Sequence, residues 1–132
     1  MILKMTLDIV PVPKPRMTQR DKRLPKRPCV ARYHAFKDEV LLKSKLFGYD
    51  PEFDVYRINA TAYLPMPASW SERKKKEHDG RPHRKRPDAD NILKAICDSL
   101  LSEDSGVFHK EIKKYWSDEG QLDIVIEYNG KE

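Results

Sequence analysis

The pattern of hydrophobic and polar residues predicts four β-strands. Residues 1–10, 53–64, 107–116 and 121–129 carry apolar side chains at nearly every second position. This is the spacing at which one face of a half-buried strand meets a core. The last two segments are joined by Ser117-Asp118-Glu119-Gly120, and we expect this turn to connect them as a hairpin-like pair.

Three further segments have helical patterns. Residues 33–47 place apolar side chains on roughly one side and stop at Gly48. Residues 70–78 predict a short basic helix, with Ser69 as its N-cap and Glu72 at the capping-box position. Residues 89–101 carry a clean apolar stripe at helical spacing. The apolar positions are Phe36, Val40, Leu41 and Leu42 in the first helix and Ile92, Leu93, Ile96, Leu100 and Leu101 in the third.

These elements predict an α+β fold: a small mixed β-sheet of about four strands flanked by helices. The length of 132 residues fits one domain over residues 1–132. Between the first strand and the first helix lies a long basic loop, residues 16–32, and a loop of that length in a compact domain is usually functional or disordered.

The distribution of charge along the chain gives the first indication of a function. Residues 11–32 carry eight Lys and Arg against one acid, and residues 72–86 carry eight against three. The whole chain has a net charge of only +5, so the remaining residues are acidic on balance. Basic segments around an acidic patch favour a surface that grips phosphates beside a metal site. The alternative is that both segments are ordinary solvated loops.

Several other classes of protein do not fit the sequence. Cys29 and Cys97 are isolated and the four histidines lack zinc-ligand spacing, so we expect no structural zinc. Residues 1–10 contain Lys4 and Asp8 and no small-residue cleavage site, which favours a strand over a signal peptide. No apolar run approaches the roughly 20 residues of a membrane span. We expect a cytoplasmic protein with reduced thiols.

The residues with the clearest candidate chemistry lie where the second basic segment meets the third helix. Asp90, Lys94 and Asp98 are spaced to share one helix face, Asp88 precedes it, and Asp104 can return from the following turn. Clustered carboxylates repel one another, and Mg²⁺ relieves this repulsion through oxygen ligands. The alternative is that an aspartate simply caps the helix while Lys94 forms surface ion pairs.

The order of motifs closely resembles the RusA family of Holliday junction resolvases, in the form carried by phages and prophages. The resemblance extends from about residue 2 to 128. It rests on Pro11-Val12-Pro13-Lys14-Pro15-Arg16, Ser69-Trp70-Ser71-Glu72-Arg73-Lys74-Lys75-Lys76, Arg86-Pro87-Asp88-Ala89-Asp90-Asn91-Ile92-Leu93-Lys94-Ala95, Asp98-Ser99-Leu100 and Glu103-Asp104-Ser105.

The resemblance implies a homodimeric, Mg²⁺-dependent endonuclease of DNA recombination and repair, with Mn²⁺ able to replace Mg²⁺. Such an enzyme resolves four-way junctions by paired, symmetrical nicks. Asp88, Asp90 and Asp104 match the metal-binding aspartates and Lys94 matches the catalytic lysine. The acidic pair here is Glu103-Asp104, where members more often carry Asp-Asp, so Glu103 remains an alternative third ligand.

The basic segments would hold the arms of the junction through phosphate contacts, with shape giving selectivity. Two other functions stay open at this stage: a branched-DNA-binding protein without catalysis, and a metal nuclease acting on forks or flaps. The residues expected to contact DNA are Lys14, Arg16, Arg20, Lys22, Arg23, Arg73, Lys74, Lys75, Lys76, Arg84, Lys85 and Arg86.

Overall fold

A four-stranded mixed sheet forms the centre of the computed structural model, which describes residues 1–22 and 27–130. Its order is β1-β4-β2-β3, with β4 antiparallel to both of its neighbours and β3 parallel to β2. The predicted α+β class with a mixed sheet is confirmed. The strands are β1 (Ile2–Leu7), β2 (Asp54–Pro65), β3 (His109–Ser117) and β4 (Gln121–Asn129).

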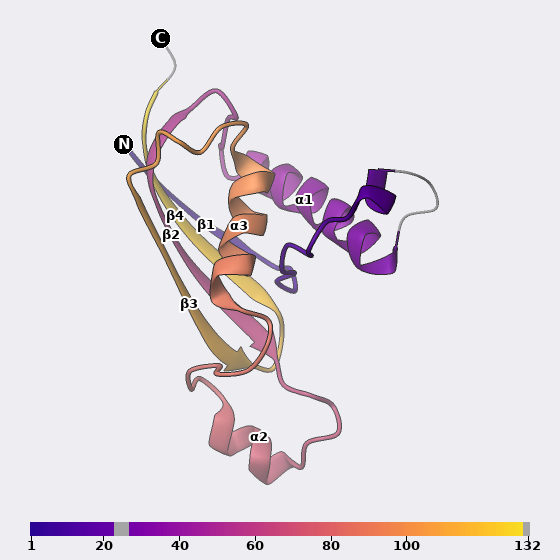
Figure 1. Cartoon of the computed structure of the whole chain (residues 1–132). Helices are drawn as coiled ribbons and strands as arrows, with labels where there is room; N and C mark the ends of the chain where they lie inside the picture. The colour runs from indigo at the N-terminus through magenta and orange to yellow at the C-terminus, as the bar shows by residue number, and fades with distance from the viewer. Residues whose placement is uncertain (23–26, 131–132) are drawn as a thin grey trace.

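Two helices lie on the same side of this sheet and a third stands apart from it. The pair consists of α1 (Pro28–Leu46) and α3 (Ala89–Leu100), whereas α2 (Glu72–His78) projects beyond one end of the sheet (Figure 1). The other face of the sheet is not covered by any helix of the described residues (Figure 1). None of the helices described is long and apolar enough to cross a membrane.

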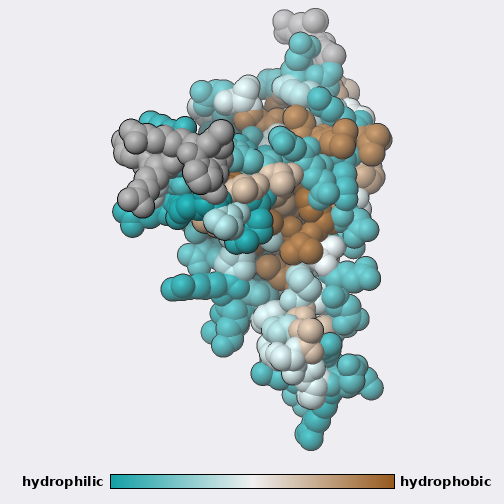
Figure 2. Space-filling view, turned by 90° about the vertical axis from the view of Figure 1, so that its right-hand side faces the viewer, coloured by the Kyte–Doolittle hydropathy of each residue, from teal (hydrophilic) through white to brown (hydrophobic). Residues whose placement is uncertain are grey.

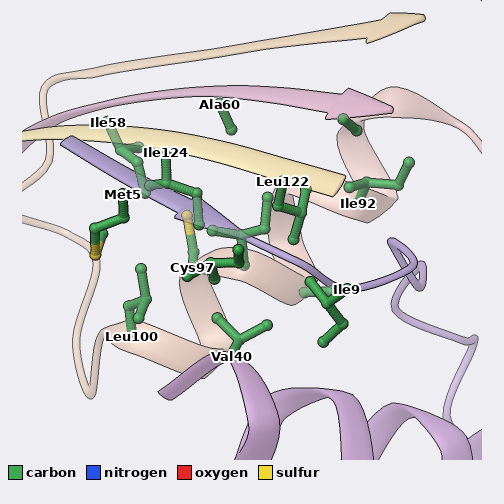
Figure 3. Close-up of a cluster of buried hydrophobic side chains, with 14 of the residues drawn as sticks. Met5, Ile9, Val40, Ile58, Ala60, Ile92, Cys97, Leu100, Leu122 and Ile124 are labelled. Atoms are coloured by element: carbon green, nitrogen blue, oxygen red, sulfur yellow. The ribbon is translucent and has the colours of Figure 1, made fainter. Parts of the chain in front are cut away.

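The core fills the space between the sheet and the two helices. Ile58 of β2, Ile124 of β4, Val40 of α1 and Ile92 of α3 are all fully buried there, and Figure 3 shows such side chains converging from the strands and both helices. Cys97 lies in this cluster as a buried free thiol, as its place in the apolar pattern predicted. Packing against the core therefore fixes which face of α3 is left for solvent.

The alternation in β2 contains one irregularity that the structure explains. Val55 and Ile58 are both buried although they are three residues apart, an odd spacing that should place them on opposite faces. The pairing with β4 shifts between Val55 and Arg57, so one extra residue is inserted into β2 at this point. This β-bulge restores the phase, and both apolar side chains reach the core.

The expected hairpin between the last two strands is wrong. β3 and β4 follow each other in sequence and run antiparallel, but β2 lies between them. Alternation reveals a strand and its buried face, but it carries no information on which strand becomes the neighbour. The connecting turn packs instead on the chain after β1, where a Cβ added to Gly120 would lie 2.6 Å from the Cα of Val10.

The predicted start of the first helix was also wrong. α1 begins at Pro28, so the end of the expected basic loop is helical; proline at the first position is favourable because its missing N–H would have no partner there. Leu42 is 63% exposed and does not belong to the buried stripe. The buried face is built from Val30, Tyr33, Phe36, Val40 and Ser44.

The short basic helix begins two residues later than predicted. Ser71, not Ser69, is the N-cap of α2, and its hydroxyl accepts a hydrogen bond from the Lys74 N–H at 3.2 Å. Trp70 precedes the helix and packs on Trp116 of β3, with 4.8 Å between ring centroids. An aromatic contact therefore anchors the base of α2 to the sheet.

Candidate active site at the start of α3

Asp88 occupies the N-cap position of α3 without using its side chain to cap the helix. Its backbone is extended, and its carbonyl accepts the first helical bonds from the N–H groups of Asn91 and Ile92 at 3.2 Å. The side chain makes no capping hydrogen bond. The Asp88 carboxylate is therefore available to bind a ligand. It lies beside the start of a helix, where the helix dipole favours negative charge.

Asp90 and Lys94 form an exposed pair one turn apart on α3. The Lys94 Nζ lies 3.8 Å from an Asp90 carboxylate oxygen, and the two side chains are 61% and 71% exposed. A pair this exposed contributes little to the free energy of folding. Both groups can therefore interact with a ligand at low cost.

The chain after β1 forms the opposite wall of this site. The Lys14 N–H donates to the carbonyl of Asn91 at 3.0 Å, and the Lys14 Nζ lies 2.8 Å from an Asp98 carboxylate oxygen. These two contacts hold the proline-rich segment against α3. The spacing of Asp98 had suggested a partner in Lys94, but the structure pairs Asp98 with Lys14.

Two neighbouring grooves run between these walls. The first contains both Asp88 and Asn91 and is bordered by the cations Lys14 and Arg86. The second lies between Arg16 and Lys94 and shares Lys14 and Asn91 with the first. Four cations thus line the two grooves beside the start of α3, which suits a substrate that carries negative charge. The remaining lining residues are Pro11, Pro13 and Pro87 in the first groove and Pro15 in the second.

Asp98 also accepts a hydrogen bond from the hydroxyl of Tyr33 on α1. Burial alone would raise the pKa of the Asp98 carboxyl, but the hydrogen bonds from Lys14 and Tyr33 outweigh it and hold that pKa below its ordinary value. Burial, together with the Asp98 charge, raises the pKa of Tyr33. Asp98 is therefore an anion that joins α1, α3 and the Lys14 segment.

We expect Asp98→Asn to change how stability depends on pH. The pKa of Asp98 is lower in the folded state than in the unfolded chain, so its charge stabilises the fold above the unfolded value of about 3.9. This contribution is lost as the pH falls below that value. Urea unfolding between pH 3 and 7 should therefore show a difference between wild type and variant that is largest near pH 7 and shrinks in acid. A difference that stays constant with pH would contradict this role.

The basic residues predicted to contact DNA occupy two regions beyond the grooves. On α2, Arg73 pairs with Glu77 at 3.2 Å, and the Lys74 ammonium lies 4.4 Å from the centroid of the Trp70 ring. The connector to α3 exposes Arg84, Lys85 and Arg86, and α2 also carries Lys75 and Lys76. The part of the molecule that carries α2 is largely hydrophilic in Figure 2, whereas hydrophobic residues gather over the body.

The other basic region precedes α1. Lys22 is exposed, Arg20 belongs to the short 3-10 helix Gln19–Lys22, and Arg23 lies outside the described residues. Arg27 forms two hydrogen bonds with the Asp21 carboxylate, at 2.8 Å and 2.7 Å. This ion pair gives the basic segment a defined conformation where it meets the helix.

Asp104 and Glu103 do not join the two aspartates at the start of α3. Asp104 follows the far end of α3, which is about 18 Å long at 1.5 Å per residue. Its carboxylate accepts a hydrogen bond from Lys110 of β3 at 2.7 Å, which lowers the pKa of Asp104. Glu103 accepts a hydrogen bond from the Ser105 N–H at 3.1 Å. The short turn after α3 therefore does not return an acid to the helix start in this structure.

Lys114 of β3 is a site residue that sequence reasoning missed. Its Nζ donates to the carbonyls of Lys85 and Pro87, at 2.7 Å and 2.6 Å, directly before Asp88. Burial lowers the pKa of Lys114, while the charge of Asp88 acts to raise it. A signal was present in the sequence: Lys114 falls between Ile112 and Trp116 in the alternation of its strand, at a position that should face the core.

The donor atoms at the start of α3 suit a hard cation. Asp88 and Asp90 supply carboxylate oxygens and Asn91 an amide oxygen, and Mg²⁺ is usually held by one or two carboxylates together with water and substrate phosphate. Within the described residues, no three His, Cys, Asp or Glu side chains are grouped to hold a metal ion. The protein thus offers two carboxylates and one amide here, and water or substrate oxygens would have to complete the coordination of a bound ion.

Comparison with known proteins places the chain in a family. The family described as "Endodeoxyribonuclease RusA" matches residues 7–127, which include all of the grooves and α3. A similar protein is "Uncharacterized protein YqaN" of Bacillus subtilis (strain 168), with 33% identity over 52% of this chain and 54% of that protein. The chain thus spans about half the length of this relative.

Proposed function

Because the chain belongs to the RusA family of endodeoxyribonucleases, we propose that it is a Mg²⁺-dependent endonuclease that resolves four-way DNA junctions by paired nicks. The observation that carries the proposal is the combination, at the start of α3, of Asp88 in a cation-lined groove with the exposed Asp90–Lys94 pair, whose lysine borders the neighbouring groove. A site for DNA binding alone would gain affinity by losing the carboxylates, since they repel phosphate.

In this proposal Asp88 and Asp90 hold the metal, with Mn²⁺ able to replace Mg²⁺. The bound ion would supply Lewis-acid chemistry and lower the pKa of a coordinated water. Lys94 would stabilise the negative charge that develops on the phosphoryl oxygens. Lys14, Arg16 and Arg86 border the grooves and would bind phosphates on either side of the cleaved bond.

Asp104 remains a proposed third ligand on the strength of the resemblance. To act there it would have to exchange its ion pair with Lys110 for contact with the metal. We also propose a homodimer, because two strands of like polarity must be cut in a four-way junction and a two-fold axis supplies two equivalent sites.

The proposal is tested by cleavage of end-labelled DNA. A mobile four-way junction, a fork, a flap and a linear duplex of the same sequence are each incubated with protein and Mg²⁺, Mn²⁺ or EDTA. We expect symmetrical nicks in the junction alone, supported by either metal and absent with EDTA. Cleavage of forks or flaps in preference to junctions would make the protein a nuclease of different specificity. Tight junction binding without any cleavage would make it a non-catalytic binder.

Replacing Lys74, Lys75 and Lys76 of α2 together by alanine should weaken junction binding and reduce its dependence on salt. The slope of log affinity against log salt concentration should flatten by up to about 0.9 for each phosphate contact that is lost. The matched control replaces Lys4, Lys45 and Lys113, which are exposed away from α2 and the grooves. Equal slopes for the two triple variants would show that α2 does not contact DNA.

A further inference from the structure

The connector that leads from α2 to Asp88 is attached along the outer edge of β3. The N–H of Trp116 donates to the carbonyl of Arg81 at 2.9 Å, and the N–H of His83 donates to the carbonyl of Lys114 at 3.0 Å. The His83 ring packs on the Trp116 ring with 4.0 Å between centroids. Residues 81–83 therefore run antiparallel along β3 and pair with its free edge for a short distance.

Backbone hydrogen bonds between the connector and β3 end at His83. Beyond that residue, the side chain of Lys114 holds the connector to the strand. Its Nζ binds the carbonyls of Lys85 and Pro87, which lie on either side of Arg86. Lys114 is half-buried, and these carbonyls supply hydrogen bonds to a cation that has lost part of its water. The single ammonium thus fixes the direction of the backbone immediately before Asp88.

We propose that Lys114 is a positioning residue for Asp88. By holding the Lys85 and Pro87 carbonyls, it sets the place and orientation from which the Asp88 carboxylate enters the groove. The inference rests on the proposed function, since it takes Asp88 to be a metal ligand. Groups that orient the ligands of a metal site typically affect metal affinity or activity by 10- to 100-fold when they are removed.

The strand offers a matched control for this role. Lys113 is adjacent to Lys114 but is exposed on the uncovered face of the sheet, where its register partner is Thr61 of β2. Lys113→Met and Lys114→Met make the same change in charge and in side-chain chemistry. Only Lys114→Met removes the contacts to the connector.

The test measures Mn²⁺ binding by the whole protein from the electron paramagnetic resonance signal of the free ion. We expect Lys114→Met to raise the Mn²⁺ dissociation constant about tenfold, whereas Lys113→Met leaves it unchanged. Asp88→Asn should weaken binding by at least as much, and the double variant Asp88→Asn/Lys114→Met should bind no more weakly than Asp88→Asn alone. Such non-additivity is expected when one residue acts through the other.

Junction cleavage provides the second readout. Lys114→Met should lower kcat about tenfold, and the Kd for the junction should change by less than kcat does, because Arg86 is the one cation of the two grooves that the connector carries. If Lys114→Met does not fold, as judged by its Tm, Lys114→Gln is used; its amide can still donate to one carbonyl, and we expect a smaller loss in the same direction.

The outcomes separate the two proposals. Additive losses in the double variant, or unchanged Mn²⁺ affinity in both Lys114 variants while Asp88→Asn binds weakly, would overturn the role of Lys114 alone. Unchanged Mn²⁺ affinity and unchanged cleavage in Asp88→Asn would overturn the proposed metal site, and the role of Lys114 with it.

Discussion

Asp90→Asn is expected to lower the rate of junction cleavage by about 100- to 1000-fold while the protein still binds the junction. The amide has nearly the same shape as the carboxylate but no negative charge, so it is a far weaker ligand for a hard cation. Removing a negative charge beside phosphates should leave junction affinity the same or improve it. Single-turnover cleavage and gel-shift binding, measured on the same junction, separate the two effects.

The fold should tolerate this substitution. The Asp90 side chain is 71% exposed and its ion pair with Lys94 is open to water, so the substitution removes only two weak interactions, with Lys94 and with the helix dipole. Asp118→Asn is the matched control, because Asp118 is an exposed aspartate in the turn between β3 and β4 and does not belong to α3. If Asp90→Asn lost binding and cleavage together and also lowered the Tm, Asp90 would have a structural role instead.

Lys94→Ala should lower kcat by about 100-fold and weaken junction binding by no more than about threefold. An interaction that forms only with the charge of the transition state affects the chemical step, whereas an ordinary phosphate contact affects both states equally. Lys94 borders the second groove together with Lys14 and Arg16, so two other cations remain to bind the substrate when it is removed. Kinetics under single-turnover conditions and equilibrium binding measure the two quantities.

Lys4→Ala provides the control for this variant, because Lys4 is an exposed lysine of β1 on the far side of the core from α3. It should leave both quantities unchanged. Equal losses of kcat and affinity in Lys94→Ala would identify Lys94 as a phosphate contact, and the catalytic assignment would be withdrawn.

Much of the fold could be predicted because each element carries its own periodic pattern. The buried positions of β2, from Val55 to Leu64, are those of the alternation, and the bulge near Tyr56 accounts for the one break in phase. Two errors concerned the exact starts of α1 and α2, and the larger one, the hairpin, fell where the pattern gives no information. The turn at Ser117-Asp118-Glu119-Gly120 joins two antiparallel strands, but only packing places β2 between them.

The contacts of the candidate site are likewise of two kinds, those that local spacing predicts and those that only packing creates. Helical spacing was sufficient to place Asp90 and Lys94 on one face, because residues four apart on a helix are neighbours, and the structure brings the two side chains to 3.8 Å. The pairing of Asp98 with Lys14 joins residues 84 positions apart, and the contact of Lys114 with the connector depends on the edge position of β3. Both contacts depend on how separate elements pack.

The sequence by itself determined that the four strands and three helices exist, though not where α1 and α2 begin, together with the charge of the two basic segments and the Asp88–Lys94 motif. Local periodicity and composition govern these features. The tertiary structure alone decided the order of the strands, the separation of Asp104 from the start of α3, and the roles of Asp98 and Lys114. These depend on contacts between residues far apart in the chain. Such contacts are selected by the packing of one common core, which no local pattern encodes.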